Sequence, residues 1–242
     1  MIVAFTRLHY GKDYLGWVIS SALPFVDKFI VLYTPVPTFG RATPLTCPDS
    51  REELLGIAQT VAGDKLDWRE GLSISAEVAM KLYPDTELAL ELDADEVIHP
   101  ALFEQIRERH AKGELTEYCY RLPFWHHWRS FRYVCDDGGW PARLYSPQKP
   151  RADAVYFDGA AARVHHFGYA RAEADMRYKW STSAHGDEFR ADWWQDIWCK
   201  FPERLTDLHP VSRDYWNAQI MEADKLPPIL RDHPYIDREV IA

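Results

Sequence analysis

The sequence has few cysteines and no long apolar run, and these features argue against a disulfide-rich protein and against a membrane-spanning one. Its four cysteines, Cys47, Cys119, Cys135 and Cys199, form no CxxC pair, so we expect reduced thiols rather than a disulfide framework or a structural zinc site. No segment approaches the roughly 18 to 20 consecutive apolar residues of a membrane span, and the first residues lack a signal peptide's long apolar region. We therefore expect a soluble, cytoplasmic protein without a transmembrane segment.

Positive charge is also in short supply. Lysine and arginine together number 28, against 37 aspartates and glutamates, and the formal net charge is -9 at pH 7. This balance opposes broad electrostatic attachment to nucleic acid or to anionic lipid. The acidity favours instead a small-molecule ligand that is bound through a metal ion.

The chain does have enough apolar sequence, 47% of its 242 residues, to bury the core of one large domain. Short apolar runs alternate with amphipathic segments through its first hundred residues. Strands are expected at 2–5, 29–33, 65–68 and 87–92, and helices at 13–23, 49–61, 71–82 and 101–112. This alternation predicts an α/β fold with a mostly parallel sheet flanked by helices.

The pattern changes in the second half of the chain. Three short segments, 118–122, 143–145 and 154–157, are typical of strands separated by glycine and proline. From Ala172 onward the sequence predicts a mostly helical tail. Because no linker or internal repeat is visible, we expect residues 172–242 to pack as an extension on the same domain.

Three carboxylates stand where a buried strand gives way to a loop, in the segment Leu92-Asp93-Ala94-Asp95-Glu96. Ligands of open α/β sheets bind at the carboxyl ends of strands, and carboxylate oxygens suit Mg²⁺ or Mn²⁺. Asp93 and Asp95 point to the same side of an extended chain, so both can serve one ligand and its ion. The alternative is an ordinary polar loop, with Asp95 or Glu96 near the start of the next helix.

Three segments, in this order along the chain, resemble the glycosyltransferases of the GT-A fold, specifically the family 2-like members. Residues 13–31 resemble the family's first helix and second strand, residues 92–96 its DxD motif, and residues 166–171 (HFGYAR) its HxGY motif. The resemblance covers about the first two-thirds of the chain. It implies a Rossmann-like GT-A catalytic domain over residues 1–171, with a donor half at about 1–100 and an acceptor half at about 101–171.

The resemblance also implies roles for three residues. Asp93 would hold the donor's ribose or a metal-bound water, Asp95 would ligate the Mn²⁺ or Mg²⁺ that bridges the diphosphate, and His166 would complete the metal shell. Such an ion neutralises charge that develops on the leaving nucleoside diphosphate. For His166 the alternative is ordinary packing or hydrogen bonding at a strand end.

Donor recognition is expected at the strand ends that lie beside Asp93. The candidates there are Thr6, Arg7, Tyr10, Tyr33 and Thr34. Lys179, in the helical tail, could close over the diphosphate, although most such charges belong to solvated helix faces. The sequence departs from the family at residues 8–12 and 33–34, so UDP, the commonest donor nucleotide of the family, is favoured without being fixed.

A transferase that acts by direct displacement needs a general base for the acceptor hydroxyl. Asp136 and Asp137, within CDDGGW, are the candidates, and Asp158 is a second one. The alternative is a glycine-rich turn whose aspartates bond only its backbone. Trp125 and Trp140 are candidates for stacking on the acceptor, against the alternative that the aromatic-rich segments pack in the core.

These patterns predict a metal-dependent hexosyltransferase that moves a sugar from a nucleotide-sugar donor to a hydroxyl acceptor. The acceptor can be a glycan, a lipid-linked sugar, a small molecule or a modified nucleic-acid base, the last being disfavoured by the net charge. A nucleotidyltransferase is a second hypothesis, but it normally needs a Gly-rich phosphate loop, and the loop at 7–12 has only Gly11. A noncatalytic module that binds nucleotide sugars is a third, and it would bind the donor without turnover.

Overall fold

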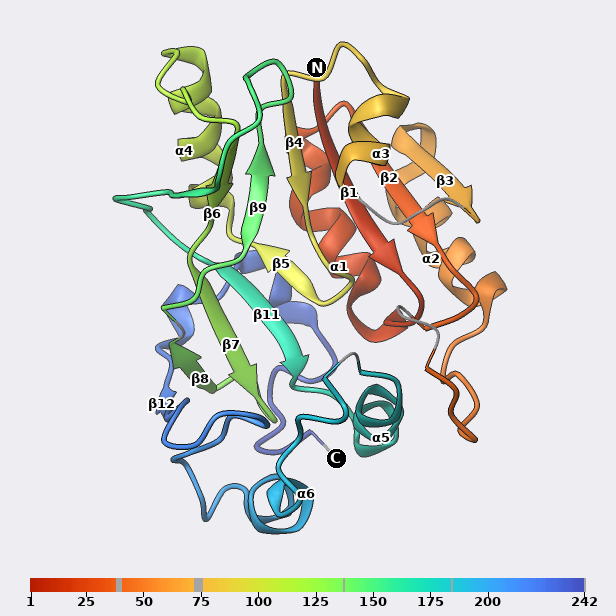
Figure 1. Ribbon diagram of the computed structural model, residues 1–242, viewed down its shortest axis with the longest axis vertical. Coiled ribbons are helices and arrows are strands. Elements are labelled where there is room, and N and C mark those ends of the chain that lie inside the picture. The colour runs from red at the N-terminus through yellow and green to blue at the C-terminus, as the bar shows by residue number, and fades with distance from the viewer. Residues whose placement is uncertain (38–40, 72–75, 137, 184, 242) are drawn as a thin grey trace.

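The computed structural model describes residues 1–37, 41–71, 76–136, 138–183 and 185–241. Its strands form two sheets, the smaller of which lies below the larger in Figure 1. The strands of the larger sheet are β1 (Ile2–Leu8), β2 (Lys28–Tyr33), β3 (Leu66–Glu70), β4 (Leu88–Glu91), β6 (Cys119–Arg121), β9 (Ala142–Tyr145) and β10 (Val155–Tyr156). Those of the smaller sheet are β5 (Glu96–Ile98), β7 (Phe124–Trp128), β8 (Tyr133–Asp136), β11 (Val164–Tyr169) and β12 (Ala218–Ile220).

The larger sheet is mostly parallel. Its strand order is β10-β6-β9-β4-β1-β2-β3. Strand β1 pairs in parallel with both β2 and β4, and β2 pairs in parallel with β3. Strand β9 is antiparallel to its neighbours β4 and β6. The predicted α/β fold with a mostly parallel sheet flanked by helices is confirmed.

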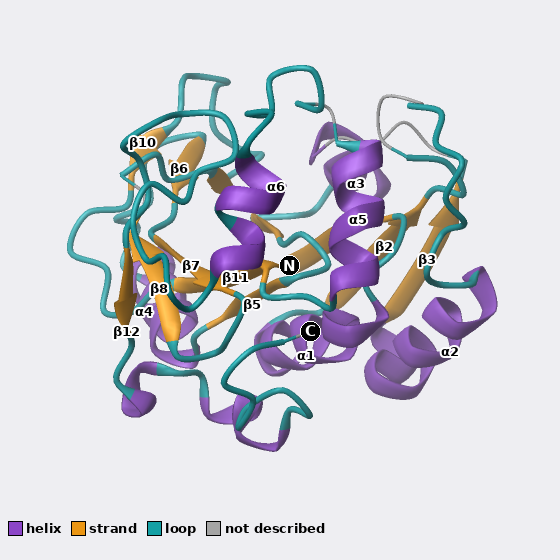
Figure 2. Cartoon of the chain, turned by 90° about the horizontal axis from the view of Figure 1, so that it is seen from below, coloured by secondary structure: helices purple, strands orange, loops and turns teal. Residues whose placement is uncertain are grey.

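Alternate residues of the strands face two different layers of helices, as the pleat of a strand requires. The helices are α1 (Lys12–Ala22), α2 (Arg51–Ala62), α3 (Ala76–Leu82), α4 (Pro100–Ala111), α5 (Glu173–Thr182) and α6 (Trp193–Asp196). Ala4 and Val31 belong to the same apolar cluster as the buried faces of α1, α2 and α4. Val3 and Ile30 pack on the opposite side against the α3 segment. Figure 2 shows α1 and α2 together on one face of the sheet.

Local signals explain where the first helices begin. Ser50 and Glu53 form a capping box at the start of α2, each side chain bonding the other residue's backbone N–H, which is the expected use of serine and glutamate three residues apart. Proline opens α4 at its first position, where its missing N–H costs nothing. The predicted helix at 71–82 appears as α3, and residues 72–75 lie outside the described part of the chain.

The smaller sheet was not predicted. Its order is β12-β8-β7-β11-β5, and β11 runs parallel to β7 and antiparallel to β5. We call the segment Leu92–Glu96 the acidic loop. It begins directly after β4 and ends at the first residue of β5, Glu96, so it joins the two sheets. The FWHHW segment, which contains the predicted stacking residue Trp125, is the central strand β7.

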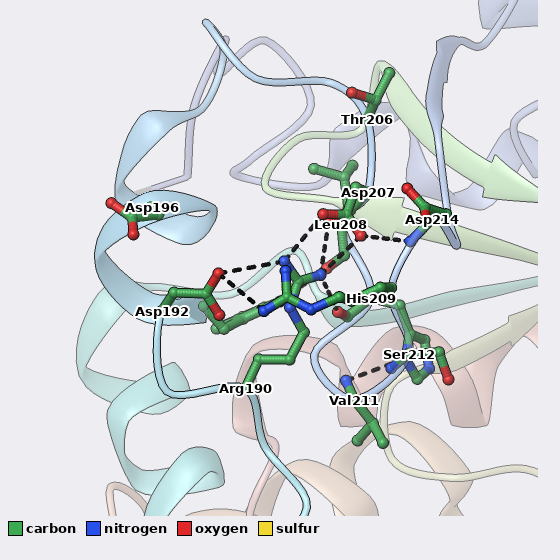
Figure 3. A network of polar contacts seen from close by, with 12 residues as sticks. Arg190, Asp192, Asp196, Thr206, Asp207, Leu208, His209, Val211, Ser212 and Asp214 are labelled. Carbon is green, nitrogen blue, oxygen red and sulfur yellow. Dashed lines mark hydrogen bonds and ion pairs between the residues drawn. The ribbon is translucent and has the colours of Figure 1, made fainter.

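The tail beyond Ala172 is less helical than predicted. It contains α5, the four-residue α6, several short 3-10 turns and the edge strand β12. Prolines at positions 202, 210, 227 and 228 interrupt any longer helix. Part of this tail is fixed instead by Arg190, which donates to both carboxylate oxygens of Asp207 at 2.8 and 2.9 Å, as Figure 3 shows.

The end of the described chain lies against the beginning of α1. His233 Nε2 donates a hydrogen bond to the backbone oxygen of Asp13 (3.0 Å), and Tyr235 OH donates to the Asp13 carboxylate (2.8 Å). The ring of Tyr14 stacks on that of His233, with 5.0 Å between centroids. We call residues 233–241 the terminal strap. Among the described residues, none of the helices combines the length and the apolar character that a bilayer crossing requires.

Candidate active site

A cavity of about 340 Å³ lies at the carboxyl ends of the parallel strands β1 and β4. In Figure 1 the arrowheads of these strands point toward the smaller sheet and α5. The cavity is lined by Arg7, Leu8, His9, Tyr10, Thr34, Asp93, Ala94, Asp95, His166, Arg171 and Lys179. The DxD and HxGY segments, which are about seventy residues apart in the sequence, therefore meet at one site.

The loop after β1 is pressed against the acidic loop. Gly11 has a φ of 137°, and a Cβ at this position would lie 3.1 Å from Cβ of Ala94, so both the conformation and the space require glycine. The backbone N–H groups of Gly11 and Lys12 donate to Asp49 Oδ2 at 2.6 and 2.9 Å. The amides that open α1 are thereby satisfied by a carboxylate of the chain itself.

Asp93 is held by two arginines. Arg143 Nη2 lies 2.7 Å from Asp93 Oδ2, and Arg7 Nη2 lies 3.4 Å from Asp93 Oδ1. Arg143 also donates to both oxygens of Glu96, at 2.6 and 2.8 Å, and Arg7 lies 2.9 Å from Glu91. Arg143 reaches these acids because it stands on β9, the antiparallel neighbour of β4. Each oxygen of Asp93 thus faces a guanidinium group.

Asp95 has its own arginine. Arg171 Nη2 donates to Asp95 Oδ2 at 2.7 Å, and both side chains are almost wholly buried. Burial alone would raise the pKa of Asp95, but the charges of Arg171 and Lys179 outweigh it and hold the pKa well below its usual value. Asp95 is therefore ionised at neutral pH and forms a buried ion pair.

His166 faces Asp95 from β11. Its Nε2 lies 3.6 Å from Asp95 Oδ1, and its Nδ1 shares a hydrogen bond with Nδ1 of His126 at 2.8 Å. Burial lowers the pKa of His166 well below the usual value, so the imidazole is neutral at pH 7.

Gly168 makes room for two side chains of the cavity. A Cβ at this position would lie 2.7 Å from Nζ of Lys179 and still closer to Nε2 of His166. The ammonium group of Lys179 donates to Gly168 O at 3.0 Å. The glycine of the HxGY segment is thus explained by the packing of a lysine and a histidine over it.

One wall of the cavity is aromatic. His9 bonds Thr34 O through Nδ1 (2.9 Å) and the hydroxyl of Tyr178 through Nε2 (2.8 Å). Tyr10 meets Tyr178 edge to face, with centroids 5.2 Å apart, and the guanidinium of Arg171 lies 5.2 Å from the Tyr10 ring. This wall offers ring faces and polar edges to a planar ligand.

The predicted donor residues divide into two groups. Arg7, Tyr10, Thr34, Asp93 and Lys179 line the cavity. Thr6 and Tyr33 do not line it: Thr6 is fully buried within β1, and Tyr33 stacks on Trp68 with 5.3 Å between ring centroids.

The predicted catalytic and acceptor residues lie away from this cavity. Asp136 forms an ion pair with Arg163 at 2.6 Å, and Arg163 lies 3.9 Å from the centroid of Trp125. Trp140 meets Tyr156 edge to face. Asp137 falls outside the described residues. The structure does not bring Asp136, Trp125 or Trp140 to the cavity, and their roles stay predictions.

Sequence reasoning missed the arginines that pair with the acidic loop. Arg171 stands in the HxGY segment, but its position there gives no sign of a partner at Asp95. Arg143 is 47 residues beyond Glu96, and nothing in local spacing points to their contact. The contact of Asp49 with the first amides of α1 could not be predicted from spacing either, because only the fold brings its carboxylate to Gly11.

The residues present are a poor fit for Mn²⁺ or Mg²⁺, which take about six oxygen ligands. Three of the four carboxylate oxygens of Asp93 and Asp95 face arginine nitrogens, at 2.7, 2.7 and 3.4 Å. Asp95 Oδ1 and Nε2 of His166 are the donors left over. Within the described part of the chain, no group of three or more His, Cys, Asp or Glu side chains is arranged to hold an ion.

The sequence matches no family model and no curated protein. Similar solved structures include S. aureus TarS 1–349 (11% identity, TM-score 0.38, 60% of this chain and 47% of that one) and TarS 1–349 with UDP (11%, 0.38, 60% and 46%). Another is the galactosyltransferase LgtC in complex with donor and acceptor sugar analogues (13%, 0.34, 62% and 59%). The chain spans less than two thirds of the length of each.

Proposed function

We propose that the chain transfers a sugar from a nucleotide-sugar donor, with a UDP-sugar favoured, to a hydroxyl-bearing acceptor. The observation that carries the proposal is the make-up of one cavity at the carboxyl ends of parallel strands. Its cationic side chains suit a diphosphate, and its histidine and tyrosine rings suit a nucleoside. Its position is the one at which open α/β sheets bind their ligands.

The chemistry of glycosyl transfer matches the charges of the cavity. The bond between the sugar's anomeric carbon and a diphosphate oxygen breaks, its electron pair stays with the diphosphate, and the acceptor oxygen bonds to the carbon. Negative charge therefore grows on the leaving group, where Arg7, Arg171 and Lys179 would stabilise it. The acceptor proton passes to a base, and Asp136 and Asp137 stay predictions for that role.

Nucleotidyl transfer is less well supported. That chemistry normally uses backbone N–H groups at the start of a helix to cradle phosphates. Here the N–H groups of Gly11 and Lys12 already donate to Asp49, so the start of α1 has no free amides for a phosphate at these two positions. The identity of the hexose, the acceptor, the cytoplasmic location and the predicted Mn²⁺ or Mg²⁺ stay predictions.

A donor panel tests the proposal. The protein is incubated with UDP-, GDP-, CMP- and dTDP-linked sugars, and both its melting temperature and the release of free nucleotide are measured. We expect one donor to raise the melting temperature and to be consumed slowly, and we expect Arg171→Gln to abolish both effects. Arg177→Gln, on the exposed side of α5, serves as the charge-matched control.

Two outcomes would contradict the proposal. If no donor shifts the melting temperature or is consumed, the cavity is not a donor site. If one donor binds but no nucleotide is released under any condition, the chain is a noncatalytic binding module.

A further inference from the structure

The charges that line the cavity do not balance. Its cationic lining residues are Arg7, Arg171 and Lys179, and its carboxylates are Asp93 and Asp95, so three positive charges face two negative ones. Glu91 and Glu96, the two other acids of this region, do not line the cavity; they are almost wholly buried and pair with Arg7 and Arg143. Among the side chains that line the cavity, cationic groups therefore outnumber carboxylates.

This surplus favours an anion and opposes a divalent cation. Asp95 offers an ion only Oδ1, beside Nε2 of His166, unless the buried pair between its Oδ2 and Arg171 opens, and breaking such a pair is strongly unfavourable. For an ion to reach Asp93, the contacts with Arg143 and Arg7 would have to give way as well. A diphosphate, in contrast, can approach Arg171 and Lys179 without displacing a carboxylate from either.

Lys179 is the group most available to a phosphate. Within the described residues its Nζ donates to a carbonyl, Gly168 O at 3.0 Å, rather than to a carboxylate. Ammonium groups bind phosphate as point charges, and guanidinium groups bind it through paired N–H donors. Lys179 and Arg171 lie on α5 and on the loop before it, so one segment supplies both.

We infer that the site holds the diphosphate of its donor with Arg171, Lys179 and Arg7 and takes no divalent ion. In this arrangement Asp93 and Asp95 are not metal ligands: they are the carboxylates that position arginines at the edge of the cavity. The inference rests on the proposed function, since it names what takes the place of the metal in the same site. It also replaces the Mn²⁺ or Mg²⁺ that the DxD segment predicts.

Calorimetric titration with UDP, GDP, CDP and ADP tests the inference. Each nucleoside diphosphate is added to the protein in buffer with EDTA and again in buffer with Mn²⁺. We expect at least one of them to bind with the same dissociation constant in both buffers, within about twofold. Binding that appears only with Mn²⁺ would overturn the inference and leave the proposed function standing. No binding in either buffer would overturn both.

Variants of Lys179, Arg177 and Asp95 distinguish phosphate binding without a metal from metal ligation by Asp95. Lys179→Gln should weaken the binding of UDP in EDTA by about tenfold to a hundredfold, the range for losing one charged hydrogen bond. Arg177→Gln on the same helix should leave it unchanged. Asp95→Asn, which still offers an oxygen to Arg171, should tighten binding several-fold because a negative charge near the phosphates is removed.

Under metal ligation the same Asp95→Asn change would weaken binding, and that result would overturn the inference. Titration of the wild-type protein with Mn²⁺ alone gives an independent readout, for which we expect no saturable binding. A melting curve of each variant verifies that it is folded, and the comparison of EDTA with Mn²⁺ on the wild-type protein stands even if a variant fails to fold.

Discussion

The substitution Gly168→Ala should separate ligand binding from folding. The new methyl group would come within 2.7 Å of Nζ of Lys179 and closer to Nε2 of His166, so both groups must move. Because these atoms are the ends of side chains, the fold can yield by turning them away from Gly168. We expect a loss of about 1 kcal/mol in the free energy of unfolding, at the low end of the range of about 1 to 3 kcal/mol for overpacking.

The effect on binding should be larger. Moving Lys179 removes a charged contact with the diphosphate, which is worth about 1.5 to 3 kcal/mol, or roughly a tenfold to 150-fold change in dissociation constant. Urea denaturation measures the first quantity and calorimetric titration with UDP the second. Gly56→Ala is the control, because a Cβ there meets nothing within 4 Å. Its expected effects are a gain of about 0.5 to 1 kcal/mol in helix stability and unchanged binding. Wild-type UDP affinity in Gly168→Ala would refute the reasoning.

Three further predictions concern stability. Arg143→Met should lower the free energy of unfolding by about 3 to 5 kcal/mol in urea, since it strands the buried Glu96 without its partner, and a loss below about 1 kcal/mol would contradict this. Burial lowers the pKa of His127 from 6.5 to about 3, so its stabilising effect is complete above pH 6.5 and falls by about 1.4 kcal/mol per pH unit as the pH drops toward 3. The drop in free energy of unfolding from pH 7 to pH 5 should be smaller in His127→Phe than in the wild-type protein. An equal drop in both would exclude this cause. Tyr14→Phe, which removes the hydroxyl that donates to Ala170 O, should cost about 1 to 3 kcal/mol in the same assay, and an unchanged urea midpoint would show that this bond adds nothing to stability.

The first hundred residues of the fold could be predicted because their signals are local. Apolar runs predicted β1, β2 and β4, and helical periodicity predicted α1 and α4. Position at the end of β4 also drew attention to Asp93 and Asp95, which do line one cavity with His166. Residues within a few positions of one another carry enough information for these conclusions.

The smaller sheet and the arginine partners could not be predicted, since they depend on contacts between distant segments. Strand β7 reads FWHHW, and its rings are compatible with either a core strand or a binding surface until β8 and β11 are placed beside it. Arg143 meets Glu96 only because β9 runs antiparallel between β4 and β6. Lacking these contacts, the sequence pattern favoured a metal where the structure has arginines.

The terminal strap has a consequence for the order in which the protein is made. Residues 233–235 cover Asp13 and Tyr14 at the beginning of α1, and Ile241 N donates to Arg129 O. While a ribosome is still translating the chain, α1 can pack on its sheet, yet this part of its surface stays open until the strap has emerged. A nascent chain that pauses near residue 200 would therefore present Tyr14 and its neighbours to chaperones, as partly folded chains commonly do. Synonymous codons that slow translation of the terminal strap should lengthen this exposure.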